Sequence, residues 1–207
     1  MRTIRFVAWI LVVLVAGVTI AVLVSEDVRE AVLGSPGDGP GIASVGGPFE
    51  MIDDTGKTVT EADFLGKPSV FFFGFTHCPD VCPTTLYEMS TYLEELGDDA
   101  DKLNVAFVTV DPERDTPQIM SDYISPFDPH ITGLSGSPEQ VAAMTKAWRV
   151  YSRRVDQDDG EYTMDHTATV YLMDADGKFV GTIAYGEADD IALGKLKRLV
   201  ENPRSQG

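Results

Sequence analysis

The only two cysteines of the chain, Cys78 and Cys82, are separated by three residues within the segment FTHCPDVCP at 75–83. In an oxidising compartment such a close pair can form a small structural disulfide. It can also act as a redox couple, or supply two thiolate ligands to a soft metal such as Cu(I) or zinc. A disulfide here would close a very small loop, so the stabilisation expected from reduced chain entropy in the unfolded state is slight. The common redox motif has two intervening residues rather than three, and the cysteines alone leave all three uses open.

Prolines follow both cysteines and restrict the backbone around them. A residue that precedes proline is disfavoured in the helical region, so Cys78 and Cys82 are predicted to lie in a constrained loop. Pro83 suits the first position of a helix, which makes Cys82 the predicted cap of that helix. Unpaired amides and the positive end of the helix dipole would favour a thiolate at such a cap.

One histidine, His166, lies far downstream in the segment MDHT at 164–167, just before a predicted strand. Its imidazole could supply a third ligand to the cysteine pair, and Asp165 could orient the ring from behind. Taken alone, a single histidine is more often an ordinary core or surface residue. His77 is adjacent to Cys78, but neighbouring side chains tend to diverge.

The segments between these residues define the elements that must position them. Two short, continuous apolar runs are typical of strands buried on both faces. Thr116-Pro117 and Ser137-Pro138 each combine a cap with a first-turn proline, which predicts two helices. The predicted elements are strands at 69–75, 105–110, 167–173 and 178–185, with a turn at 174–177, and helices at 84–96, from 117, from 138 to 148 and at about 189–201.

This order of elements is that of an α/β, thioredoxin-like fold. A β-hairpin at the N-terminal side, with strands at 49–52 and 58–60, would be an addition to that fold, as would the helix near Pro138. Thioredoxin-like oxidoreductases normally carry a cis-proline facing their cysteines. Residues 162–168 contain no proline, which speaks against ordinary thiol–disulfide catalysis.

The N-terminal residues predict a single transmembrane helix. Residues 6–24 carry no charge, and as a helix they would reach about 28 Å, close to the ~30 Å hydrocarbon core of a bilayer. Arginines precede this span and acidic residues follow it, which predicts a soluble domain on the extracytoplasmic (periplasmic or outer) side of the cell membrane. No small-residue cleavage site is evident, so we expect an uncleaved anchor, with a cleaved signal peptide as the alternative.

The charge of the chain excludes one class of partner. With 33 acidic and 16 basic residues the net charge is −17, whereas binding to nucleic acid requires a basic face. Most of the acidic residues are expected simply to solvate the surface. Asp111 and Asp115 flank Glu113 and Arg114 at the end of a predicted strand. They could form a charged network at the rim of the cysteine site or cap the next helix, and a structural role is favoured.

Three segments resemble the signature segments of the Sco/SenC family of copper proteins, in the same order: FTHCPDVCP at 75–83, VDPERDTP at 110–117 and DHT at 165–167. The resemblance covers roughly residues 49–200 and the anchor. It implies a thioredoxin-like fold and one copper ion, Cu(I) or Cu(II), held by Cys78, Cys82 and His166. The domains would then be a stub and anchor at 1–25, a flexible Gly/Pro-rich linker at 26–43 and a thioredoxin-like copper-binding domain at 44–204.

The resemblance also implies a role, which is the delivery of copper to the binuclear copper centre of cytochrome c oxidase. The chain would be a metallochaperone rather than an enzyme, and its partner the copper-bearing oxidase subunit or another copper-accepting protein. Only reduced cysteines bind the metal, so Cys78 and Cys82 would also form a redox-active disulfide. The alternative is a thiol–disulfide reductase or redox sensor that acts on partner cysteines.

Overall fold

The computed structural model describes Trp9, residues 45–158 and residues 160–204. Apart from Trp9, the predicted anchor and linker lie outside the described residues, so the boundaries at 25 and 43 stay predictions. In the part of the chain that is described, no helix is both long and apolar enough to cross a membrane. The elements, in chain order, are β1 (Glu50–Asp53), β2 (Thr58–Thr60), the 3₁₀ helix η1 (Glu61–Phe64), β3 (Ser69–Gly74), α3 (Val81–Leu96), the 3₁₀ helix η2 (Gly97–Lys102), β4 (Asn104–Thr109), α4 (Pro117–Ile124), β5 (Ile131–Ser135), α5 (Pro138–Ala147), β6 (Ser152–Asp156), β7 (Tyr162–His166), β8 (Val170–Met173), β9 (Phe179–Ile183) and α6 (Asp189–Glu201).

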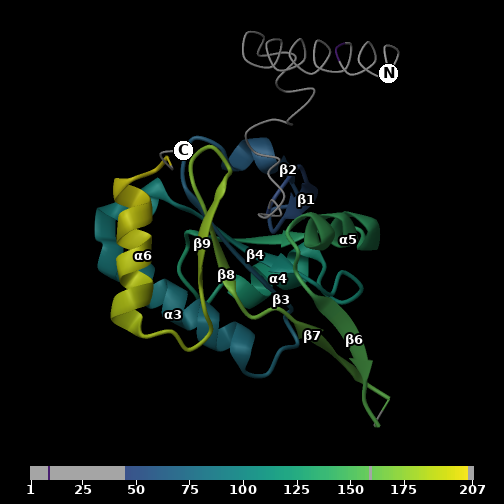
Figure 1. Ribbon diagram of the computed structural model, residues 1–207. Helices are drawn as coiled ribbons and strands as arrows, with labels where there is room; N and C mark the ends of the chain where they lie inside the picture. Colours follow the sequence, from purple (N-terminus) through teal and green to yellow (C-terminus); the bar gives the residue numbers. More distant parts are fainter. Residues whose placement is uncertain (1–8, 10–44, 159, 205–207) are drawn as a thin grey trace. The chain divides into compact units, whose positions relative to one another are not determined.

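Seven of the strands form one mixed sheet in the order β2-β1-β5-β4-β3-β8-β9 (Figure 1). Strands β3, β4 and β5 are parallel, and β8 and β9 continue the sheet in antiparallel pairing. This is the thioredoxin-like arrangement predicted from the sequence, with the β1–β2 hairpin added at the edge next to β5. All six residues of β3 are buried, which explains its uninterrupted apolar sequence.

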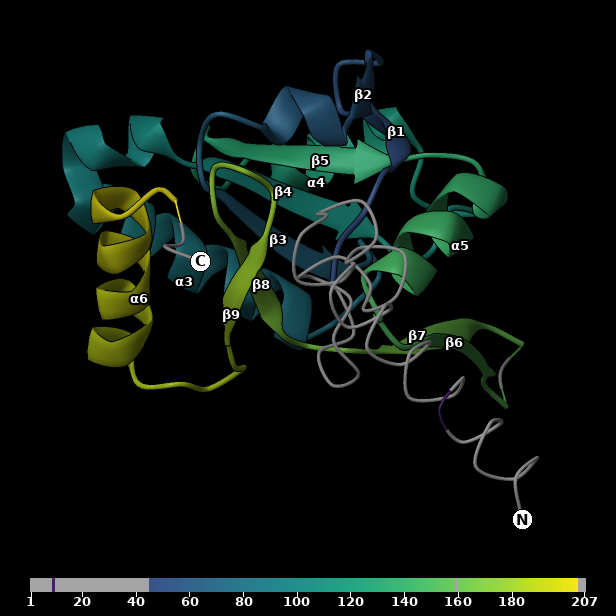
Figure 2. The ribbon, with the colours of Figure 1, turned by 45° about the horizontal axis from the view of Figure 1, so that its top comes forward.

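Aromatic side chains pack against both faces of the sheet. Phe71 contacts Trp148 at the end of α5, with the ring centroids 4.4 Å apart. Phe72 points to the opposite face, because side chains alternate along a strand, and it stacks on Phe107, which in turn stacks on Tyr123 of α4. Helices α3 and α6 lie on one side of the sheet and α5 on the other (Figures 1 and 2). The core therefore fixes the sheet from both sides.

Three chain segments meet at one edge of the sheet, the edge formed by the C-terminal ends of β3 and β4. β3 and β4 are parallel, with Gly74 opposite Thr109, so the segments that follow them leave at the same edge. β8 is antiparallel to β3, with Phe72 opposite Val170. The residues that precede β8 therefore return to the edge where the cysteine segment begins.

The start of α3 differs from the prediction. The helix begins at Val81 and its N-cap is Asp80, so the expectation that Cys82 caps the helix was wrong. Cys82 lies in the first turn instead, followed by Pro83. Proline is tolerated there because the first amides of a helix have no partner within it.

The segment around His166 also differs from the prediction. The strand expected at 167–173 is shorter than predicted, since β8 begins only at Val170, and a further strand that was not predicted, β7, ends at His166. β7 pairs with β6 in a separate two-stranded sheet that projects from the main sheet (Figures 1 and 2). The sequence of β6, SRRVD, lacks an apolar alternation, which is why this hairpin was not predicted.

Candidate metal centre

Cys78, Cys82 and His166 lie together at this edge of the sheet. Their ligand atoms are all within 4.8 Å of one another, and the Sγ of Cys82 is 3.7 Å from the Nε2 of His166. With metal bonds of about 2.3 Å to sulfur and about 2.0 Å to nitrogen, two ligands of one trigonal or tetrahedral ion lie ~3.5–4.0 Å apart. The cluster therefore has the dimensions of a site for a single ion.

The two cysteines differ in exposure. Both are free, and Cys82 is completely buried whereas Cys78 is half-buried in the loop before α3. The backbone amide of Cys82 donates a hydrogen bond to the Sγ of Cys78 at 3.4 Å. This contact holds the sulfur of Cys78 against the first turn of α3, within 4.8 Å of the sulfur of Cys82.

The cysteine pair shares a single proton over a wide pH range. A hydrogen bond from the thiol of Cys82 lowers the pKa of Cys78 to about 3, against the effect of burial. The same hydrogen bond, together with burial, raises the pKa of Cys82. At neutral pH Cys78 is thus a thiolate and Cys82 a thiol, and a metal that binds both must displace one proton.

The imidazole of His166 is oriented by the backbone. Its Nδ1 lies 3.0 Å from the carbonyl oxygen of Thr167. A carbonyl oxygen can only accept, so Nδ1 carries the proton and Nε2 presents its lone pair towards Cys82. The ring also meets Phe75 edge to face, with the centroids 5.7 Å apart. This tautomer is the one that a metal ligand through Nε2 requires.

The prediction that Asp165 orients this ring was wrong. Neighbouring residues on a strand face opposite sides, and the exposed carboxylate of Asp165 pairs with Arg153 across the hairpin at 3.3 Å. The carbonyl of Thr167 takes its role. A backbone acceptor leaves no trace in the residue types, so the sequence could not reveal it.

The other two histidines of the chain, and the methionine of β7, have contacts of their own. His77 is exposed, and its Nδ1 contacts the hydroxyl of its neighbour Thr76. His130 is held between Asp128 and Asp101, whose hydrogen bonds raise its pKa. Met164 packs against the hydrophobic core.

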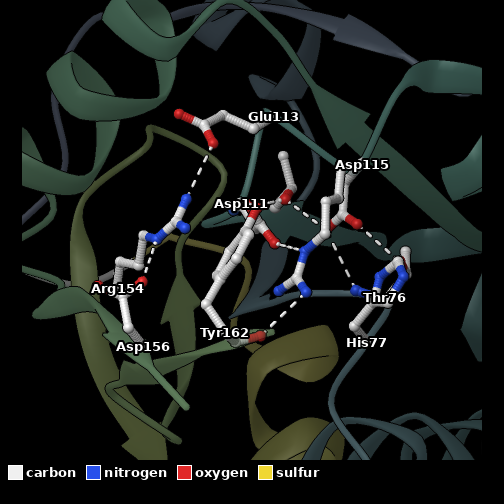
Figure 3. Close-up of polar contacts among 10 residues, drawn as sticks. Thr76, His77, Asp111, Glu113, Asp115, Arg154, Asp156 and Tyr162 are labelled. Atoms are coloured by element: carbon white, nitrogen blue, oxygen red, sulfur yellow. Dashed lines mark hydrogen bonds and ion pairs between the residues drawn. The ribbon is translucent and has the colours of Figure 1, made fainter. Parts of the chain in front are cut away.

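The turn between β4 and α4 supports the cysteine loop. Asp115 is completely buried, and burial raises its pKa although it accepts several hydrogen bonds. Its donors are the hydroxyl of Thr109 and both the amide and the hydroxyl of Thr76, at 2.6–3.1 Å (Figure 3). Thr76 lies two residues before Cys78, so these bonds fix the start of the loop.

The two roles left open for the acidic residues of this turn can now be separated. The cap of α4 is the hydroxyl of Thr116, which accepts from the amide of Ile119 at 3.3 Å. Asp111 and Asp115 instead form the charged network at the rim of the cluster (Figure 3). Of the two predicted roles, the charged network is the one observed, and the residue that caps α4 is Thr116.

The fold and the cluster together define a thioredoxin-like domain with two cysteines and one histidine placed where they could hold a metal ion. The chain belongs to the SCO1/SenC family, whose model matches residues 38–201. It is 38% identical to Protein SCO1 homolog 1, mitochondrial, of Arabidopsis thaliana over 80% of this chain, and 36% identical to Protein SCO2, mitochondrial, of Saccharomyces cerevisiae over 78%. It spans about half the length of these relatives, 50% and 54% respectively.

A solved structure shares the fold over most of the described chain. The structure of Bradyrhizobium japonicum ScoI with copper bound is 52% identical and superposes with a TM-score of 0.71. The match covers 75% of this chain and 99% of that one. The family and the thioredoxin-like fold predicted from the sequence are therefore confirmed.

Proposed function

We propose that this protein is a copper chaperone that holds one Cu(I) or Cu(II) ion between Cys78, Cys82 and His166. The observation that carries the proposal is the convergence of the three ligand atoms within 4.8 Å. Thiolates select the soft Cu(I) ion, and an imidazole nitrogen adds a ligand suited to Cu(II). The copper-bound relative from Bradyrhizobium japonicum, at 52% identity, supports copper as the ion.

The acceptor in this proposal is the copper-bearing subunit of cytochrome c oxidase, which the resemblance of residues 75–83, 110–117 and 165–167 to the family's signature segments implies. Copper can be loaded only while the cysteines are reduced, because a disulfide offers no thiolate. Loading is then gated by the redox state of Cys78 and Cys82. The protein acts as a carrier rather than as an enzyme.

The proposed location is the extracytoplasmic face of the cell membrane, with residues 6–24 as a single-pass anchor and residues 26–43 as a flexible linker. The uncharged span and the arginines before it support this arrangement. A reporter enzyme that is active only outside the cytoplasm, fused after residue 207, should be active and remain in the membrane fraction. An inactive fusion would contradict the orientation, and an active fusion released from the membrane would contradict the anchor.

Titration of the reduced full chain with Cu(I) and Cu(II) tests the site. We expect one ion per chain, and substitution His166→Ala should weaken Cu(II) binding by about 10–100-fold or more, since it removes a direct ligand. The matched control is His77→Ala, which removes an imidazole next to Cys78 but outside the cluster. If His166→Ala leaves the affinity and stoichiometry for both ions unaltered, His166 is not a ligand.

A second function, reduction of disulfides in a partner, is favoured by the asymmetry of the pair. A half-exposed thiolate at Cys78 beside a buried thiol at Cys82 is the arrangement of a nucleophilic and a resolving cysteine. Turnover of a disulfide substrate by the metal-free chain measures this activity. Rapid turnover would favour the reductase function, whereas slow turnover together with stoichiometric copper binding would favour the chaperone.

A further inference from the structure

The position of His166 depends on a hairpin that has little support of its own. β6 and β7 pair only with each other, and most of their residues are exposed or half-buried. A two-stranded ribbon of this kind is marginally stable in isolation. Contacts with the rest of the domain must therefore hold β7 against the cysteine loop.

Tyr162 provides such contacts at the far end of β7. Alternation along the strand puts Tyr162 and His166 on the same face, about 13 Å apart. Met164, between them on that face, packs against the core. The ring of Tyr162 lies between two guanidinium groups, with the Cζ atoms of Arg114 and Arg154 each 3.7 Å from its centroid.

Hydrogen bonds connect Tyr162 to the turn after β4. Its hydroxyl donates to the buried carboxylate of Asp111 at 2.9 Å, and its carbonyl oxygen accepts from Arg114 at 3.0 Å (Figure 3). Arg114 also pairs with Asp111. Arg154 is held in turn by Glu113 at 3.4 Å and by Asp156 at 2.8 Å.

The same turn holds the other half of the metal centre. Asp115 accepts the hydrogen bonds of Thr76 that fix the cysteine loop, while Asp111 and Arg114 hold Tyr162 on the histidine hairpin. One short segment, residues 111–115, thus sets the distance between ligands that are 84 residues apart in the chain.

We propose that Tyr162 is a positioning residue for the copper site: clamped by Arg114, Arg154 and Asp111, it holds the β6–β7 hairpin so that His166 faces the cysteine pair. This inference rests on the proposed copper-binding function. Loss of the clamp frees the imidazole but leaves both cysteine sulfurs in place. Loss of the clamp should therefore weaken the binding of Cu(II), which needs the nitrogen ligand, far more than the binding of Cu(I).

The experiment compares the full chain with its Tyr162→Leu, Tyr162→Phe and Tyr151→Leu variants. Tyr151 is the matched control, an exposed tyrosine just before β6. For Tyr162→Leu we expect the Cu(II) dissociation constant to rise about 10–100-fold, as for other groups that orient a ligand. Nitrogen hyperfine structure in the Cu(II) electron paramagnetic resonance spectrum should weaken in the same variant. Tyr162→Phe keeps the ring between the two cations and should recover part of the affinity.

A second readout does not depend on copper. In the metal-free chain, hydrogen exchange of the β7 amides should accelerate about tenfold in Tyr162→Leu, and exchange in β3 should not change. A Tyr162→Leu chain with the parent's Cu(II) spectrum, affinity and β7 exchange would overturn the clamp. If the parent itself binds no copper, the proposed function fails, while faster β7 exchange in Tyr162→Leu would still support the clamp. Faster exchange in β3 as well would mean that Tyr162 supports the whole fold, which would also overturn its specific role.

Discussion

Gly74, the last residue of β3, lies directly against the sulfur of Cys82. A Cβ atom added at Gly74 would be 2.7 Å from the Sγ of Cys82 and 2.7 Å from the ring of Phe107. Neither neighbour is free to move, because both side chains are completely buried. The absence of a side chain at Gly74 is therefore what allows the buried thiol to approach the sheet edge.

Substitution of Gly74 by alanine should consequently displace the sulfur. We expect Gly74→Ala to lower the free energy of unfolding by about 1–3 kcal/mol, as overpacking of a core does, and to weaken copper binding. Denaturant unfolding and Cu(I) titration measure the two effects. Gly194→Ala is the control, because a Cβ there would meet only the end of Arg198 at 3.7 Å, and a helical glycine-to-alanine change should stabilise by about 0.4–1 kcal/mol. Equal stability of parent and Gly74→Ala would contradict the packing argument.

The lowered pKa of Cys78 predicts an unusual pH profile for alkylation. Because its pKa is about 3, Cys78 is a thiolate throughout pH 5–8, and its rate of reaction with iodoacetamide should be nearly constant there. The denatured chain serves as control, since an ordinary thiol loses about tenfold in rate for each pH unit below its pKa. Peptide mass spectrometry should find Cys78 modified before the buried Cys82. A rate for Cys78 that rises tenfold per unit in the folded chain would refute the assignment.

His130 should make the stability of the domain depend on pH. Hydrogen bonds to Asp128 and Asp101 raise its pKa above the ordinary value of 6.5, so the folded state favours the protonated ring. The stabilisation is fully present below pH 6.5 and is lost as the pH rises through the folded-state pKa. His130→Gln should therefore destabilise the protein at pH 5.5, by less than about 1 kcal/mol for such exposed pairs, and have a smaller effect at pH 9. Thermal unfolding at the two pH values measures this, and a larger effect at pH 9 would contradict the sign.

Asp165 should be dispensable for the metal centre. Its carboxylate pairs with Arg153 on the face of β7 opposite to His166, and the ring is oriented by the carbonyl of Thr167. We expect Asp165→Ala to leave the Cu(II) spectrum unchanged and to cost at most about 1 kcal/mol of stability. A shift in the nitrogen hyperfine coupling of this variant would restore the carboxylate as the group that orients the imidazole.

Much of the main sheet could be predicted because its sequence is locally unambiguous. The apolar run of β3, the proline-containing caps at Thr116 and Ser137, and the turn at 174–177 each favour a single local structure. The three clustered side chains were also predicted, from their residue types and from the family resemblance. Their mutual distance follows from the register of β3 with β4 and β8, which is a property of the fold.

The parts that were missed depend on tertiary contacts. β6 and β7 have few apolar residues and no apolar alternation in β6, and the contacts of Tyr162 with Arg114 hold them to the domain. The helix α3 starts at Val81, although two prolines surround this point, because its first amides need no partner within the helix. The group that orients His166 is the backbone carbonyl of Thr167, and because every residue has such a carbonyl, the sequence could not indicate it.

The two cysteine sulfurs differ in how accessible they are to molecules in solution. A nucleophile from solution can reach the sulfur of Cys78, which is half-buried, but not that of Cys82, which has no exposed surface. Any incoming thiol must therefore begin its exchange at Cys78. If the pair is oxidised to a disulfide, a partner's thiolate would form a mixed disulfide with Cys78 and release Cys82 as the leaving thiol.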